Sequence, residues 1–128
     1  MASNLVGQQR YDEIRRQFIV FASRKATRRH DSTPEKPTKW HPGGVIDPRS
    51  GAPFSPAGAW EFIVELLASG HPLEEIILEK PPGKKGYVLK HPGAAGRADI
   101  YIKLQLGSGY VHGRSFHESI YPSARSEP

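Results

Sequence analysis

Apolar side chains recur at the spacing of an α-helix near the start of the chain. Tyr11, Ile14, Phe18 and Phe21 are separated by three or four residues, with Arg and Gln between them. This spacing puts the four side chains on one face of a helix. The pattern predicts an amphipathic helix over residues 5–25.

A second helix is predicted with clear signals at both ends. Ser55 followed by Pro56 is typical of an N-cap and a first helical turn, and Gly70 is a typical stop signal. Between these ends runs one apolar stripe, which consists of Trp60, Ile63, Val64 and Leu67.

The remaining apolar positions follow the period of β-strands. Residues 76–78 are β-branched enough to begin a strand, and strand-like segments bounded by turns follow at 86–89, 99–106 and 110–117. Alternation in 99–106 directs one set of side chains to the core and leaves the other set on a polar face. The core set is Ile100, Ile102, Leu104 and Leu106, and the polar set is Tyr101, Lys103 and Gln105. We therefore expect an α+β fold, with a small antiparallel sheet and packed helices.

The last two strands are predicted to form a tight hairpin. With Ser108 and Gly109 as the turn, the expected pairs are Leu106 with Val111, Gln105 with His112, and Lys103 with Arg114. In this register His117 pairs with Ile100 and points away from the polar face. A register shift or a bulge at Gly113 would instead bring His117 to the side of Tyr101.

The chain between the two predicted helices is rich in Pro, Gly, Ser and Thr. Its prolines exclude a helix or a central strand; they are Pro34, Pro37, Pro42, Pro48 and Pro53. Trp40 either pins this loop to the body of the protein or stacks on a base. The expected organisation is a basic N-terminal helix over 1–29, a loop or linker over 30–54, an α+β core domain over 55–121 and a tail over 122–128.

Positive charge is concentrated in the N-terminal part. The net charge is +5, and residues 1–50 hold ten Lys and Arg against five Asp and Glu, whereas residues 51–128 hold eight against eight. A basic cluster of Arg24, Lys25, Arg28 and Arg29 follows the first helix, where it either complements the helix C-terminus or binds phosphate. The distribution favours a polyanionic partner, most simply nucleic acid.

The residue types present exclude several classes of chemistry. The chain has no Cys, which excludes disulfides, thiolate nucleophiles and the common structural zinc sites. The six His do not form a helical pair on one face, so we expect neither a metal nor a cofactor. Because no apolar run reaches the ~18 residues of a membrane span, we expect a soluble, cytoplasmic protein.

The polar sheet face suits an anionic transition state. RNA cleavage by the 2′-hydroxyl needs a group that takes a proton, a group that returns one, and cations around the phosphorane. His, Tyr, Lys and Arg supply these roles without a metal. The alternative is a solvated face whose lysines discourage aggregation.

The last two strands also resemble a known family. Ile100-Tyr101-Ile102-Lys103-Leu104, a short hairpin and then Gly113-Arg114-Ser115-Phe116-His117-Glu118-Ser119 are similar to the closing hairpin of MqsR-type toxins. The resemblance covers residues 55–121. It implies a RelE-like fold with an antiparallel sheet, cleavage of messenger RNA, and neutralisation by an antitoxin protein.

Candidate site residues follow from the resemblance and from the polar face together. Tyr101 matches the strand tyrosine, Lys80 corresponds to a lysine of the preceding segment, and His117 replaces the basic residue that ends the hairpin. With Arg114 as a phosphate clamp, the candidate catalytic residues are His117, Tyr101, Lys80 and Arg114. The candidate RNA-binding residues are Lys84, Lys85, Lys103, Gln105 and His112.

The resulting hypothesis is a metal-independent endoribonuclease toxin of a toxin-antitoxin system. Two alternatives stay open. The same face could bind RNA or DNA without cutting it, or the N-terminal helix and the Pro-rich loop could make the protein an adaptor that docks another protein.

Overall fold

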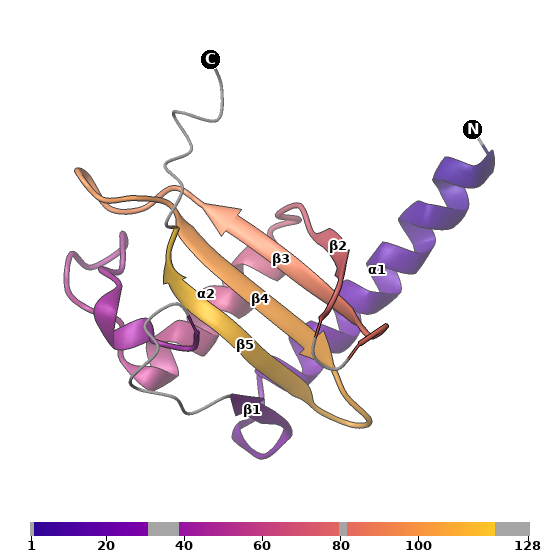
Figure 1. Cartoon of the computed structure of the whole chain (residues 1–128), viewed down its shortest axis with the longest axis horizontal. Helices are drawn as coiled ribbons and strands as arrows, with labels where there is room; N and C mark the ends of the chain where they lie inside the picture. Colours follow the sequence, from indigo (N-terminus) through magenta and orange to yellow (C-terminus); the bar gives the residue numbers. More distant parts are fainter. Residues whose placement is uncertain (1, 31–38, 80–81, 120–128) are drawn as a thin grey trace.

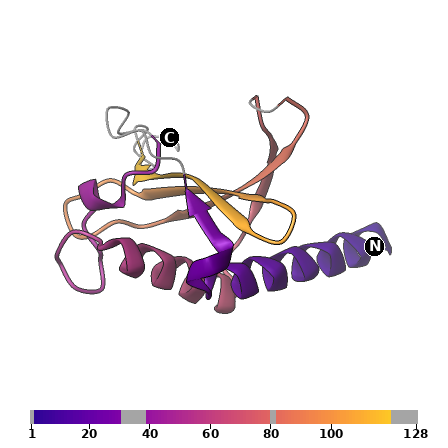
Figure 2. The ribbon, with the colours of Figure 1, turned by 90° about the horizontal axis from the view of Figure 1, so that it is seen from below.

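The computed structural model describes residues 2–30, 39–79 and 82–119, with side chains from residue 11 onward. Its fold is α+β, with a five-stranded sheet in the order β1-β5-β4-β3-β2. The strands are β1 (Arg28–His30), β2 (Glu74–Ile77), β3 (Lys85–His91), β4 (Ile100–Leu106) and β5 (Val111–Glu118). Helices α1 (Ala2–Ala22) and α2 (Pro56–Ala68) both cover one face of the sheet, and we call the opposite one the open face (Figures 1 and 2).

The predicted antiparallel sheet is confirmed for four strands, but the prediction lacked the edge strand β1. The order β5-β4-β3-β2 is antiparallel throughout, but β1 pairs with β5 in parallel, so the sheet is mixed. The sequence of β1 is Arg-Arg-His, which lacks the alternation of apolar residues that predicts a strand. It follows α1 and the short helix η1 (Lys25–Thr27), which place it beside β5 at the sheet edge.

Helix α2 forms where its end signals predict it. The Ser55 side chain accepts a hydrogen bond from the Gly58 backbone N–H at 2.9 Å, which satisfies one of the free donors of the first turn. The helix buries its apolar side against the sheet. Its buried residues are Ala59, Trp60, Phe62, Ile63, Leu66 and Leu67.

The core begins well before Ser55, which corrects the expected division of the chain. Phe18 and Ala22 of α1 are fully buried, and Val45 exposes only 1% of its surface. Both helices and residues 39–54 therefore share one core with the sheet. Neither helix, in the stretches described, is long and apolar enough to cross a membrane.

Trp40 anchors its loop to the sheet, which is one of the two roles that the sequence suggested for it. Its ring lies 4.9 Å from that of Trp60 and 5.5 Å from that of Phe116, centroid to centroid. The Phe116 N–H donates to the Lys39 carbonyl, and the His41 N–H donates to the Phe116 carbonyl, both at 2.9 Å. Residues 39–41 thus extend the sheet alongside β5. Prolines forbid regular structure in such a loop, but they do not forbid burial.

Phe18→Ala tests whether α1 belongs to the core. Removing a fully buried aromatic ring should lower the free energy of unfolding by about 3–5 kcal/mol, because a cavity replaces it. Val20→Ala, on the same helix but 45% exposed, is the control and should change stability little. Urea denaturation monitored by circular dichroism measures both. Equal stability of the two variants would show that α1 does not contribute to the core.

Candidate functional site

A bulge in β5 determines which side chains share the open face. Leu104 pairs with Gly113 and Lys103 with Ser115, so Arg114 is an extra residue on β5. The predicted pairs of Leu106 with Val111 and Gln105 with His112 are confirmed. The predicted pair of Lys103 with Arg114 is wrong, because the bulge shifts the register by one residue.

The hairpin turn and the bulge both depend on glycine. Gly109 has a φ of 82°, the left-handed region that the second turn residue needs. Gly113 faces the core, where a Cβ atom would lie 2.3 Å from the Trp40 ring. The absence of a side chain at position 113 therefore makes room for the indole.

Beyond the bulge, His117 pairs with Tyr101 rather than with Ile100. The two rings stack on the open face, with centroids 5.2 Å apart and an interplanar angle of 24°. His117 Nδ1 lies 2.7 Å from the Glu118 carbonyl oxygen. A carbonyl oxygen can only accept, so Nδ1 carries the hydrogen and the neutral ring has its lone pair on Nε2.

The Tyr101 hydroxyl is held in its protonated form. Burial raises the pKa of this phenol above its ordinary value, and the negative charge of Glu74 raises it further. The stack therefore combines an imidazole whose Nε2 can accept a proton with a phenol that can donate one, the Tyr101 hydroxyl.

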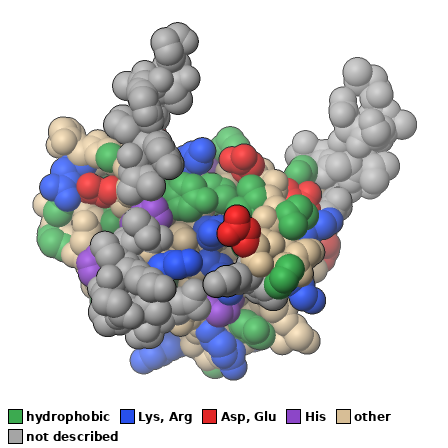
Figure 3. Space-filling view, viewed as in Figure 1, with side chains coloured by type: hydrophobic (Ala, Val, Ile, Leu, Met, Phe, Trp, Pro, Cys, Tyr) green, Lys and Arg blue, Asp and Glu red, His purple; other side chains and the backbone are tan. Residues whose placement is uncertain are grey.

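Two lysines flank the stack. Lys90 pairs with Tyr101 across β3 and β4, which makes Lys90, Tyr101 and His117 one cross-strand row. Lys103 lies in the next row, opposite Ser115. In Figure 3, Lys, Arg and His side chains lie on this face near a hydrophobic area. Sequence reasoning missed Lys90 because the predicted strand ended at residue 89; alternation with Val88 was the signal that could have extended it.

A second polar group lies further along the open face. Arg114 Nη1 donates to Gln105 Oε1 at 3.3 Å, and Gln105 pairs with His112. Gln105 lies four positions after Tyr101 along β4, which is about 13 Å at the rise of a strand. The structure therefore places Arg114 with candidate RNA-binding residues and away from the Tyr101–His117 stack.

Two other candidate lysines, Lys84 and Lys85, do not join the stack. Lys84 is exposed just before β3, and Lys85 Nζ lies 3.2 Å from a Glu75 carboxylate oxygen. Lys85 lies five positions before Lys90 along β3, which is about 17 Å at the rise of a strand. Lys80 lies outside the described residues.

The described residues hold no cluster of metal ligands at this site, and no comparison identifies a relative. In residues 11–30, 39–79 and 82–119, no group of three or more His, Asp or Glu could hold a metal ion. Comparison with protein-family models, curated proteins and solved structures gives no match for this chain. The resemblance to MqsR-type toxins therefore stays a prediction.

Gly113→Ala tests the link between core packing and site geometry. The new methyl group would clash with the Trp40 ring, and overpacking of this kind costs about 1–3 kcal/mol. We expect lower stability and weaker nuclear Overhauser contacts between the Tyr101 and His117 rings. Gly43→Ala is the control, since a Cβ there meets no atom within 4 Å. Unchanged ring contacts in Gly113→Ala would show that the register does not depend on this packing.

Proposed function

We propose that the open face cleaves RNA at the Tyr101–His117 stack without a metal ion. The observation that carries the proposal is the pairing of these two side chains across β4 and β5, which puts an imidazole and a phenol 5.2 Å apart, ring to ring. A proton acceptor and a proton donor so close together match the two proton transfers of a transesterification.

In the proposed reaction, His117 Nε2 takes the proton of the ribose 2′-hydroxyl. The 2′-oxygen attacks the adjacent phosphorus and the bond from phosphorus to the 5′-oxygen breaks. The Tyr101 hydroxyl gives its proton to that leaving oxygen, so the products are a 2′,3′-cyclic phosphate and a 5′-hydroxyl. The phenolate that remains is strongly basic, because its pKa is raised, and it recovers a proton from water or from protonated His117.

The neighbouring lysines supply the electrostatic part. Lys90 shares the row of the stack and Lys103 lies in the next row, so both ammonium groups can approach the phosphoryl oxygens. Their charge stabilises the phosphorane, which carries more negative charge than the diester. Further along, Gln105, His112 and Arg114 would hold the rest of the RNA.

Binding without cleavage is the second candidate. Arg29 lies over the Tyr110 ring, with its guanidinium carbon 4.6 Å from the centroid, and β1 pairs Arg29 with His112. Aromatic platforms beside cations bind single-stranded nucleic acid by base stacking and charge. An antitoxin partner and a cytoplasmic location remain predictions from the sequence.

Incubation of the purified protein with end-labelled RNA tests the main proposal. We expect cleavage with excess EDTA at the same rate as with Mg²⁺, and products that end in a 2′,3′-cyclic or 3′-phosphate. Loss of cutting in EDTA, or products with a 3′-hydroxyl, would contradict this mechanism. Specific RNA binding with no cleavage would favour the second candidate.

His117→Ala and Tyr101→Phe assign the activity to the stack. Removing the imidazole should lower kcat by about 10²–10⁴-fold and leave RNA affinity nearly unchanged, because it acts through proton transfer. Tyr101→Phe keeps a ring against His117 and removes only the donor, so kcat should fall while the fold is kept. His41→Ala serves as the control. Normal cutting by both site variants would place the activity elsewhere.

A further inference from the structure

Among the residues that the structure describes, several arginines form ion pairs, but a cluster of cations near β1 does not. Arg16 pairs with Glu13 at 2.9 Å, Arg49 with Asp47 at 2.8 Å and Arg97 with Glu118 at 2.7 Å. By contrast, the basic cluster between α1 and β1 makes no ion pair with any carboxylate that the structure describes; it comprises Arg24, Lys25, Arg28 and Arg29. The proposed cleavage site does not use these charges.

Two of these cations line a groove on the helix side of β1. The groove encloses about 450 Å³, within the range of small-ligand sites, and its basic wall consists of Lys25, Arg28 and His30. Pro56, Ala57 and Trp60 of α2 form the opposite wall. Three basic side chains facing an apolar wall suit an anionic ligand.

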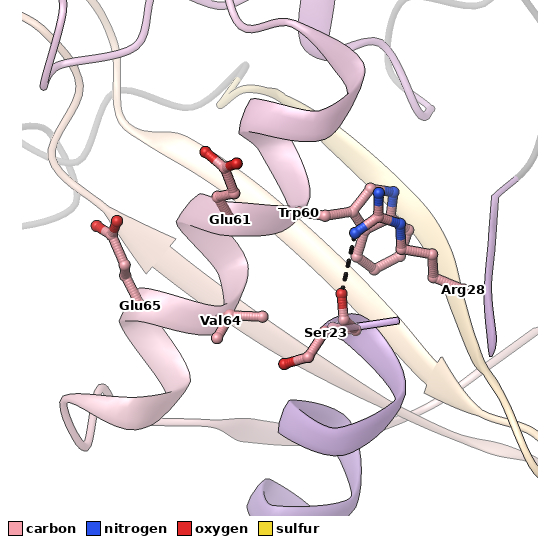
Figure 4. Close-up of a pocket in the computed structure, with 7 residues that line it drawn as sticks. Ser23, Arg28, Trp60, Glu61, Val64 and Glu65 are labelled. Carbon is pink, nitrogen blue, oxygen red and sulfur yellow. Dashed lines mark hydrogen bonds between the residues drawn. The ribbon is translucent and has the colours of Figure 1, made fainter. Parts of the chain in front are cut away.

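Arg28 is held in place at this groove. Its Nη1 donates to the Ala22 carbonyl at 3.2 Å, and its guanidinium carbon lies 5.8 Å from the centre of the Trp60 ring. Figure 4 shows the guanidinium lying across that ring between the end of α1 and α2. A cation already ordered in this way loses little conformational entropy when it binds an anion.

The adjoining pocket does not neutralise Arg28. This pocket, of about 400 Å³, shares Arg28 and Trp60 with the groove and is also lined by Glu61 and Glu65. In Figure 4 both glutamate side chains point away from Arg28, and Glu65 pairs with Arg49 at 2.8 Å. Neither glutamate therefore forms an ion pair with Arg28, which lines the groove.

Strand β1 connects the groove to the open face. Its parallel pairing puts Arg29 opposite His112 on the open face, and Arg28 opposite Val111 on the helix side. Because side chains alternate along a strand, this edge carries cations on both faces. A flexible polyanion that leaves the open face at Arg29 would meet Arg28 and Lys25 directly beyond the edge.

We propose that the groove of Lys25, Arg28 and His30 binds the phosphodiester backbone of single-stranded RNA that extends beyond the open face. The inference rests on the RNA binding of the proposed function, but not on cleavage. Single-stranded RNA can bend around the β1 edge, which a stiff duplex cannot do. The groove would make long RNA bind more tightly than short RNA.

Lys25→Gln and the double variant Lys25→Gln/Arg28→Gln test the groove. The probes are fluorescent 2′-O-methyl oligoribonucleotides, which lack the attacking hydroxyl, of about 4 and about 16 nucleotides. Their affinities are measured by anisotropy at several salt concentrations. Arg16→Gln, which removes the same charge from an exposed arginine of α1, is the matched control.

For the long probe, the slope of log affinity against log salt should become shallower by about 0.7 in the single variant and about 1.4 in the double variant. The short probe should bind all variants equally, and Arg16→Gln should resemble the wild type. An equal effect of Arg16→Gln and Lys25→Gln would overturn the proposal by showing a non-specific charge effect. So would an equal loss for both probe lengths, or displacement of the long probe by polyglutamate at equal charge concentration, which would identify an acidic protein as the ligand.

Cleavage is a separate outcome. Since the probes cannot be cut, the salt slopes report on the groove even for a protein that cuts no RNA. Absence of cleavage with the expected slopes would remove the catalytic proposal and keep the groove, whereas cleavage with unchanged slopes would do the reverse.

Discussion

The contact between the Trp40 indole and the Gly113 backbone organises this protein. Trp40 comes from the Pro-rich loop and packs between Trp60 of α2 and Phe116 of β5, over a position where a Cβ atom would lie 2.3 Å from its ring. This packing brings the loop into the core. It also lies at the β-bulge after which Tyr101 and His117 share one face. Core packing and site geometry thus depend on the same few atoms.

The described arginines differ in the partners that they bind. Arg15 of α1 donates to the carbonyls of Leu67 and His71, so it satisfies acceptors at the end of α2. Arg49 is bound to Asp47, and its hydrogen bonds hold the pKa of that carboxyl below its usual range. Such contacts stabilise the fold. Arg28 also donates to a carbonyl, that of Ala22, but the cations around β1 make no ion pair with a described carboxylate. This division supports reading β1 as a binding edge.

Local signals were sufficient for much of the fold. The helix from Pro56 to Ala68, the alternation of β4 and the turn at Ser108 and Gly109 all form as the residues predict. Each depends on neighbours close in sequence, namely a cap, a strand period or a glycine with positive φ. The α+β class follows from these elements. Tyr101 on the polar face of β4 follows from them too.

What the tertiary structure decided involves residues far apart in the chain. An Arg-Arg-His segment becomes a strand only because β5 offers an edge, and Trp40 becomes a core residue only because Gly113 leaves space for it. The bulge, and with it the partner of His117, lies at this contact between residues that are more than half of the chain apart. A sequence pattern can permit a bulge at a glycine, as it does here, but long-range packing determines whether the bulge forms.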